Sequence, residues 1–345
     1  MLTFPASGRR LVALAAAVAL AASPVLAASA AAPTTAGSGA GGAPPVVTGF
    51  AVGSLPGAVL ARDADALDTV TVAAVGLRPS GAAVDPPAAD MERVRSRAAG
   101  LGLDTELLLS NYSNDLEGFD PRAAHRLLSD PDKITAVAQQ VAGLASESGW
   151  GGVNIDLELV RKDDAAGLVA LASALNDALG SAGRLSIDVS ASSSPKGYTD
   201  NGYDLAALGR FVDVVVLMTY DYSGPTWSDP GPIGPVRWQR TAVDVASRYV
   251  PIQKLDLGIA GYGYTWPRKG TGRSVSVAQA RRMVAKDGAR ARWNGNAQEW
   301  TAKLSNGTEI WWSDRRSYDA RVALATELGM HGVAVWRLGS ADPLG

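Results

Sequence analysis

The sequence predicts an α/β protein built as a (β/α)8 TIM barrel, with a small α+β insertion between the seventh and eighth strands and a vestigial last helix. Eight short apolar runs alternate with stretches whose apolar residues recur every three or four positions, as strands and amphipathic helices do. An open doubly wound sheet is the alternative. The first run, however, leads into GFAVGSLPG, which lacks the spacing of a phosphate-binding glycine loop.

The N-terminus has the pattern of an export signal. Arg9 and Arg10 precede an apolar run over residues 11–22, and small residues follow up to Ala27. The run is shorter than the roughly 20 residues of a membrane span, so we expect a cleaved signal over residues 1–27 and no membrane partner afterwards. An uncleaved anchor is the alternative, because Ala-rich sequence continues to Ala32. The mature protein is then secreted or cell-wall associated.

The remaining chain divides into a leader and one barrel. Residues 28–45 consist of small residues with Gly and Pro, which predicts a flexible leader, and the barrel takes residues 46–345. Helical spacing is clearest over residues 132–148 and 163–179. The predicted strands are 46–52, 69–75, 106–109, 153–157, 185–189, 212–220, 255–259 and 332–336.

The lengths of two segments predict the insertion and the vestigial eighth helix. Residues 270–312 are rich in Gly and contain the strand-like TEIWWSD, which predicts a small α+β unit rather than a bare loop. Only nine residues follow Trp336, too few for a complete eighth helix.

Composition excludes several functions. The 32 Lys and Arg residues nearly balance the 34 Asp and Glu residues, and no basic arm suggests a nucleic-acid surface. No Cys is present, and the two histidines, His125 in a helical stretch and His331 before the last strand, suit neither a triad nor a metal site. We therefore expect neither metal nor cofactor. The basic cluster of residues 281–292 indicates a solvated helix face, or a contact with anionic wall polymers.

The stretch GGVNIDLELV, residues 151–160, carries the chemistry. It alternates with period two, so Asn154, Asp156 and Glu158 share one strand face. On an antiparallel edge strand that face would simply meet water. The helical stretches on both sides instead indicate a parallel strand covered outside by helices, with the polar face pointing into the barrel. Buried carboxyls are costly, so this stripe at the C-terminal end of a barrel strand indicates catalysis.

The spacing of Asp156 and Glu158 suggests which of the two carboxyls is the proton donor. They stand about 6 to 7 Å apart along the strand, with Glu158 nearer the barrel mouth. Close carboxyls raise one another's proton affinity, and the less solvated one stays protonated near neutral pH. Glu158 is the expected proton donor.

The stretch resembles the fourth-strand signature of family 18 glycoside hydrolases, the chitinase-like enzymes, written D-G-x-D-x-D-x-E. Gly152, Asp156 and Glu158 match it in register, whereas Gly151 and Asn154 replace its first two Asp residues. The GVNIDLE form is similar to the branch of spore-cortex and cell-wall lytic enzymes. Asn154 cannot hold a proton or a negative charge, which bears on the pH profile.

Three further stretches resemble later strands of the family. VVVLMTYDYSG matches the sixth-strand motif, LGIAGYGYTW (residues 257–266) the end of the seventh strand, and GVAVWRLG the eighth strand. Together the similarity spans nearly all of residues 46–345.

The resemblance implies substrate-assisted hydrolysis with net retention. Glu158 protonates the glycosidic oxygen, Asp156 holds the substrate's 2-acetamido N–H, and Tyr220 binds its carbonyl oxygen. Asn154 orients Asp156. The expected substrate contacts are Trp336, Met218, Asp221, Tyr262, Tyr264, Trp266, Asn111 and Trp227. For the aromatic members, packing in the core of the barrel top is the alternative. Asp188 shares a strand face with Ser186 and adds to the inner polar network.

These features predict an exported hydrolase of β-1,4-linked N-acetylglucosaminyl glycans, with peptidoglycan as the first substrate and chitin or chito-oligosaccharides as the second. Its partner is a polysaccharide with 2-acetamido sugars, and not nucleic acid. A catalytically silent glycan-binding barrel is the competing class, although relatives of that kind commonly lack the acid at the Glu158 position. A purely structural wall protein is a distant third, because it would not need buried Asp156 and Glu158.

Overall fold

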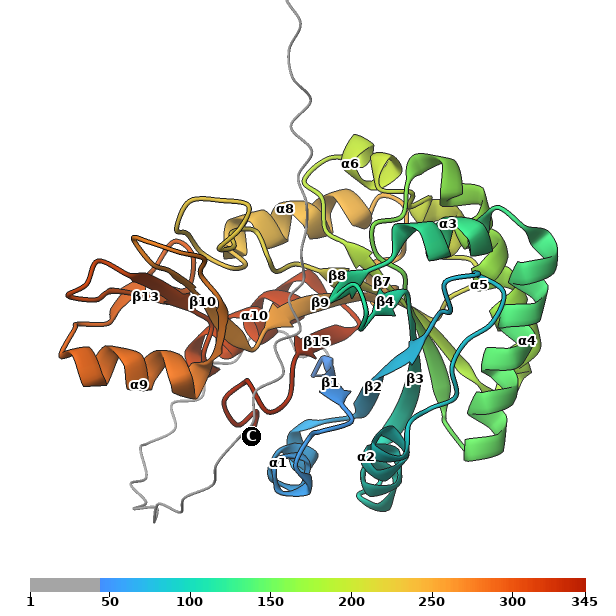
Figure 1. Cartoon of the computed structure of the whole chain (residues 1–345), viewed down its shortest axis with the longest axis horizontal. Coiled ribbons are helices and arrows are strands. Elements are labelled where there is room, and N and C mark those ends of the chain that lie inside the picture. Colours follow the sequence, from blue (N-terminus) through green and yellow to red (C-terminus); the bar gives the residue numbers. More distant parts are fainter. Residues whose placement is uncertain (1–43) are drawn as a thin grey trace, which may run out of the picture.

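The computed structural model describes residues 44–345, so the expected export signal and all but the last two residues of the expected leader lie outside the described residues. Eight parallel strands form a closed barrel in the order β1-β2-β3-β6-β7-β8-β9-β15 (Figure 1), which confirms the predicted fold class. The barrel strands are β1 (Val46–Val52), β2 (Thr69–Gly76), β3 (Asp104–Ser110), β6 (Gly152–Asp156), β7 (Arg184–Ser190), β8 (Val214–Met218), β9 (Leu255–Ala260) and β15 (Gly332–Trp336).

All eight predicted strands are present, but two end earlier than expected. The strand β8 stops at Met218 rather than at residue 220, because the backbone N–H of Thr219 turns back to the Leu217 carbonyl at 2.7 Å. The strand β6 stops at Asp156 because the next ladder donor, the N–H of Glu158, bonds to the Asn111 side chain instead. Both early ends lie at the carboxyl edge of the barrel.

Helices cover the outside of the barrel (Figure 1). The helix α4 (Pro131–Ser148) begins after Asp130, whose carboxylate accepts the N–H groups of Asp132 and Lys133, and is followed by Gly149 with φ 72°. This is an Asp cap followed by Pro at the first position and a left-handed Gly at the end. The helices are α1 (Gly57–Asp63), α2 (Ala89–Gly100), α3 (Pro121–Leu128), α4 (Pro131–Ser148), α5 (Ala165–Leu179), α6 (Pro195–Asp200), α7 (Leu205–Leu208), α8 (Val236–Ala246) and α10 (Arg315–Leu328). Short 3-10 helices cover Ala64–Ala66, Lys162–Asp164, Gly180–Ala182 and Ile252–Lys254.

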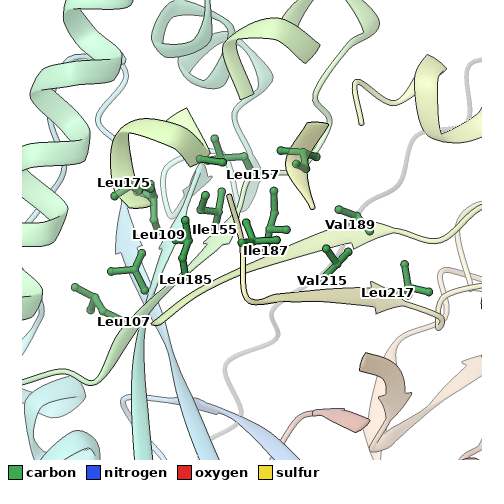
Figure 2. Close-up of a cluster of buried hydrophobic side chains, with 14 of the residues drawn as sticks. Leu107, Leu109, Ile155, Leu157, Leu175, Leu185, Ile187, Val189, Val215 and Leu217 are labelled. Atoms are coloured by element: carbon green, nitrogen blue, oxygen red, sulfur yellow. The ribbon is translucent and has the colours of Figure 1, made fainter. Parts of the chain in front are cut away.

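The main core lies between barrel and helices. Outward side chains of β3, β6, β7 and β8 form one buried cluster that also includes Leu175 of α5 (Figure 2). Within residues 44–345, the stretch Lys162–Ala182 is the one helical segment long and apolar enough by composition to cross a membrane. In this fold most of it is α5, whose Leu168 and Leu171 are buried against the barrel. No helix follows β15 in residues 337–345, as expected from the length of that tail.

The insertion between β9 and β15 is a five-stranded sheet with one helix. Its order is β11-β10-β14-β13-β12, and Figure 1 shows it beside the barrel, with α9 below the sheet in this view. Its elements are β10 (Tyr262–Trp266), β11 (Ser274–Ser276), α9 (Val277–Asp287), β12 (Arg292–Asn294), β13 (Glu299–Lys303) and β14 (Glu309–Trp312). The expected start at residue 270 was wrong. The chain leaves the barrel at Gly261, so β10 already belongs to the insertion.

A buried ion pair fixes the insertion to the barrel. Arg321 of α10 and Glu299 of β13 are both about 1% exposed and lie 3.1 Å apart. Glu299 also accepts the backbone N–H groups of Ile233 and Gly234, in the loop that follows β8. This loop, residues 219–235, is therefore held from two sides.

Candidate active site

Three carboxyls from two adjacent strands point into the carboxyl end of the barrel. Asp156 is the last residue of β6 and is 8% exposed, and Glu158 follows two residues later, half-buried. Asp188, on β7, is 4% exposed. Because Ile155 pairs with Ile187, the next residues along the two strands, Asp156 and Asp188, are lateral neighbours on the inner face.

Burial raises the pKa of each of these groups. Desolvation raises the pKa of Asp156 to about 7, against a hydrogen bond from Ser110 that lowers it. Desolvation also raises the pKa of Glu158 well above its ordinary value, and the charges of Asp156, Asp221 and Asp188 raise it further. A Glu with these neighbours holds its proton at neutral pH, as a general acid must.

The hydrogen bonds of Asn154 differ from expectation. Its Nδ2 donates to Ser186 Oγ at 2.9 Å and to Asp188 Oδ1 at 3.0 Å. The sequence interpretation had Asn154 orienting Asp156. In the structure its amide nitrogen serves the neighbouring strand instead, because Asn154 and Ser186 are register partners. Asp156 Oδ1 is buried and has no hydrogen-bond partner among the described residues.

Asn111 corrects a second expectation. Its Nδ2 donates to the carbonyl oxygens of Asp120 and Glu158 at 3.0 and 2.9 Å, and its Oδ1 accepts the N–H of Glu158 at 2.9 Å. The side chain is fully buried and both ends of its amide bond to backbone groups, which differs from the direct substrate contact expected of it. Asn111 instead fixes the backbone of Glu158 on both sides. The hairpin of β4 (Tyr112–Ser113) and β5 (Gly118–Phe119) follows it directly.

Tyr220 and Asp221 lie just past the end of β8. Desolvation raises the pKa of Tyr220 well above its ordinary value, and the carboxylates of Asp188, Asp156 and Glu158 raise it further. Tyr220 therefore stays a neutral phenol that can donate a hydrogen bond. Asp221 has φ 58°, and its Oδ1 accepts the hydroxyls of Tyr262 and Tyr264, the latter at 2.9 Å. Met218 ends β8, half-buried.

Aromatic side chains gather beside the carboxyls and form what we call the aromatic wall. Its members are Tyr220, Trp227, Tyr262, Tyr264, Trp266, Trp311 and Trp336. Tyr262, Tyr264 and Trp266 lie on β10 of the insertion, so their placement at the end of the seventh barrel strand was wrong. They alternate along β10 and hence all share one face.

Contacts within the wall are edge to face. Trp227 meets Tyr264 with ring centroids 5.8 Å apart at 85°. The Nε1 of Trp266 donates to the Ser228 carbonyl, which anchors the loop of Trp227. Trp336, at the end of β15, is half-buried against Phe50 with centroids 5.5 Å apart. The β10 aromatics are at most 8% exposed, so they pack in the core at the barrel top and offer little surface to a ligand.

Sequence reasoning missed three residues of this site. Ser110 donates to Asp156, and alternation along β3 places it inward. Trp311 is the register partner of Tyr264 on β14. Tyr203 is 3% exposed, and its pKa is raised by burial and then by Glu158 and Asp156, which places it beside them. No local pattern marks Tyr203, because it lies in an irregular loop.

The histidines and the basic cluster lie apart from this site. His331 Nδ1 lies 2.6 Å from Asp256 Oδ1 before β15, and His125 Nδ1 lies 2.5 Å from Asp164 Oδ1. Arg281 of α9 pairs with Asp314 and Asp342. Across residues 44–345, no group of His, Asp and Glu side chains is arranged to hold a metal ion.

Comparison with known proteins identifies the family. Residues 118–341 match the model of the glycosyl hydrolases family 18. The chain belongs to this family. It is a glycoside hydrolase, and its signature carboxyls Asp156 and Glu158 lie inside the matched region.

The curated relatives of the chain include cortical fragment-lytic enzymes and glycosylases. The cortical fragment-lytic enzyme of Bacillus subtilis is 28% identical over 281 residues, which cover 76% of this chain and 63% of that protein. The glycosylase YvbX of the same species is 26% identical over 247 residues, covering 69% and 72% of the two chains. This chain thus spans less than two thirds of the cortical fragment-lytic enzyme.

Solved structures give the same fold. The chitinase of Chromobacterium violaceum is 25% identical with a TM-score of 0.79, covering 87% of this chain and 96% of that one. The spore cortex-lytic enzyme SleL of Bacillus cereus superposes with a TM-score of 0.77 at 21% identity, over 87% of this chain and 72% of its own. At that identity, the second likeness speaks for the fold alone.

Proposed function

We propose that this protein is an exported glycoside hydrolase that cleaves β-1,4 bonds of N-acetylglucosaminyl glycans, with peptidoglycan as its first substrate. The observation that carries the proposal is the pair at the end of β6. Glu158 has a raised pKa, and Asp156 beside it keeps Oδ1 free of protein partners. A proton donor and a carboxylate oxygen without a protein partner are the two groups that substrate-assisted hydrolysis requires of the protein.

In the first step, Glu158 gives its proton to the glycosidic oxygen as the bond from that oxygen to the anomeric carbon breaks. The carbonyl oxygen of the substrate's own 2-acetamido group attacks the anomeric carbon and closes a cyclic oxazolinium ion. Asp156 accepts the acetamido N–H and faces the new positive charge. Tyr220, a neutral phenol in this site, donates to the acetamido oxygen.

In the second step, Glu158 acts as a base. Its carboxylate takes a proton from water as the water oxygen attacks the anomeric carbon and opens the ring, which restores the protonated acid. Two inversions at the same carbon give net retention. Glu158 must keep its position through both steps, and Asn111 holds its backbone N–H and carbonyl. Trp336 is the proposed floor for the reacting sugar.

Peptidoglycan is preferred over chitin because of the relatives with cortical fragment-lytic names. Chitin and chito-oligosaccharides are the second candidate, favoured by the similarity to the Chromobacterium violaceum chitinase. A glycan-binding barrel without activity is the competing class. The presence of Glu158, with its proton held by burial, argues against it.

Mass spectrometry of reaction products tests the proposal. Purified peptidoglycan and soluble chito-oligosaccharides are each incubated with wild type, Glu158→Gln and the exposed control Glu147→Gln. We expect new reducing-end N-acetylglucosamine products from peptidoglycan with wild type and Glu147→Gln only. Cleavage of chito-oligosaccharides alone would move the substrate to chitin. Binding to both glycans without any cleavage would establish the lectin class.

A further inference from the structure

We propose that Asp188 is a positioning residue for Asp156 and holds the proton that the pair shares. This inference rests on the proposed function. Asn154, on the strand that carries Asp156, has no titratable group, whereas the family signature has an Asp there. The structure places a carboxyl one strand away instead, at Asp188 of β7.

The placement follows from strand register. Asn154 pairs with Ser186 and Ile155 with Ile187, so Asp156 and Asp188 come next to one another on the inner face. Adjacent strands lie about 4.8 Å apart, which brings two inward carboxyls on neighbouring residues within reach of one proton. On its other side, Asp156 has Ser110 as register partner, which has no charge.

Asn154 fixes which oxygen of Asp188 can carry that proton. Its Nδ2 donates to Asp188 Oδ1 at 3.0 Å, so Oδ1 is an acceptor. A proton on Asp188 therefore lies on Oδ2. The Oδ1 of Asn154 has no partner among the described residues. Asn154 thus acts through Asp188 rather than on Asp156 directly.

The charges around Asp188 favour its neutral form. From β6 it faces Asp156, from β3 Glu106, from β9 Asp256 and from the loop after β8 the phenol of Tyr220. Arg184 lies 3.9 Å from Glu106 and pairs with that carboxyl. Burial raises the pKa of Asp188 well above its ordinary value, and Asp156 raises it further, against the Asn154 hydrogen bond.

Two buried carboxyls side by side hold one proton between them at neutral pH. When the substrate becomes cationic, Asp156 must be ionised. The proton then resides on Asp188 Oδ2 and returns when the cation is gone. The proton moves only between Asp156 and Asp188, so no other residue has to donate or accept it. A merely structural Asp188 would make its hydrogen bond to Asn154 without any effect on titration.

The test compares pH profiles of kcat/KM for wild type, Asp188→Asn, the exchange variant Asn154→Asp/Asp188→Asn, and the exposed control Asp177→Asn. Asn at position 188 can still accept from Asn154, so the fold is kept. In Asp188→Asn we expect kcat to fall at least tenfold. We also expect the alkaline limb of the profile, set by the pKa of Glu158, to move to lower pH by about 1 unit. The reason is that the side chain at position 188 can no longer ionise at alkaline pH and place a negative charge near Glu158. The exchange variant should recover most of both losses.

A profile of Asp188→Asn that coincides with wild type would overturn the inference, as would an exchange variant no better than the single variant. Thermal unfolding at pH 5 and pH 8 gives a readout that needs no substrate. The wild type loses stability as pH rises because Asp188 has a raised pKa, and the variant lacks this loss. The Tm of Asp188→Asn relative to wild type should therefore be higher at pH 8 than at pH 5. A different result would overturn the proposed function itself, namely hydrolytic activity that survives in Glu158→Gln.

Discussion

Replacing Asn111 with Ala removes the side chain that holds the backbone of the proposed acid. Three hydrogen bonds disappear, two to Glu158 and one to the Asp120 carbonyl. Each buried backbone group left without a partner costs about 1–3 kcal/mol, and water entering the vacated space recovers part of this. We expect a loss of about 3 kcal/mol in the free energy of unfolding, seen as a fall of about 5–10 °C in Tm.

The same change should reduce catalysis more than binding. Displacing Glu158 by about 1 Å costs on the order of 100-fold in rate, so kcat should fall by that factor with little change in KM. Steady-state kinetics and thermal unfolding of Asn111→Ala, Asn111→Asp and the exposed control Asn296→Ala would check this. Asn111→Asp keeps the acceptor for the Glu158 N–H and should lie in between. A variant with lowered Tm but wild-type kcat would refute the positioning argument.

Three other variants extend the account. Glu299→Gln breaks a buried ion pair with Arg321 and should lower the free energy of unfolding by about 3–5 kcal/mol in denaturant titration. A loss under 1 kcal/mol would contradict it. Tyr264→Phe removes one of two hydroxyls on Asp221 and should reduce kcat/KM about fivefold, a loss of about 1 kcal/mol, whereas an unchanged value would make that contact dispensable. Glu158→Gln should raise Tm at pH 8. The pKa of Glu158 in the folded protein lies above its ordinary value of 4.5, so the folded wild type holds a proton that the unfolded chain has released. The wild type therefore loses stability as pH rises above 4.5 and through the folded pKa, whereas Glu158→Gln does not. A Tm difference that does not grow from pH 5 to pH 8 would count against that raised pKa.

Alternation was enough to predict the barrel strands, because the helix-covered face of a parallel strand must be apolar whatever lies inside. In GGVNIDLELV it also separated Ile155 from the inward Asp156. The same rule failed for Tyr262, Tyr264 and Trp266. Period two is identical in a barrel strand and in an antiparallel insertion, so only the break at Gly261 distinguishes them.

The partners of the predicted residues were harder to foresee. Asn111 meets Glu158 across 47 positions of sequence, and Asn154 meets Asp188 across 34. Such contacts depend on which strands are neighbours and in what register, neither of which is a local property of the chain. Tyr203 reaches the site from a loop with no periodic pattern.

Proton NMR of the first product formed tests the central claim most directly. The substrate is the glycan that mass spectrometry shows to be cleaved, and the enzyme is wild type or Glu158→Gln. Substrate-assisted hydrolysis with Glu158 as the acid predicts that the β-anomer appears first, before mutarotation, and that Glu158→Gln forms no product. The α-anomer first, or activity that survives in Glu158→Gln, would contradict the mechanism.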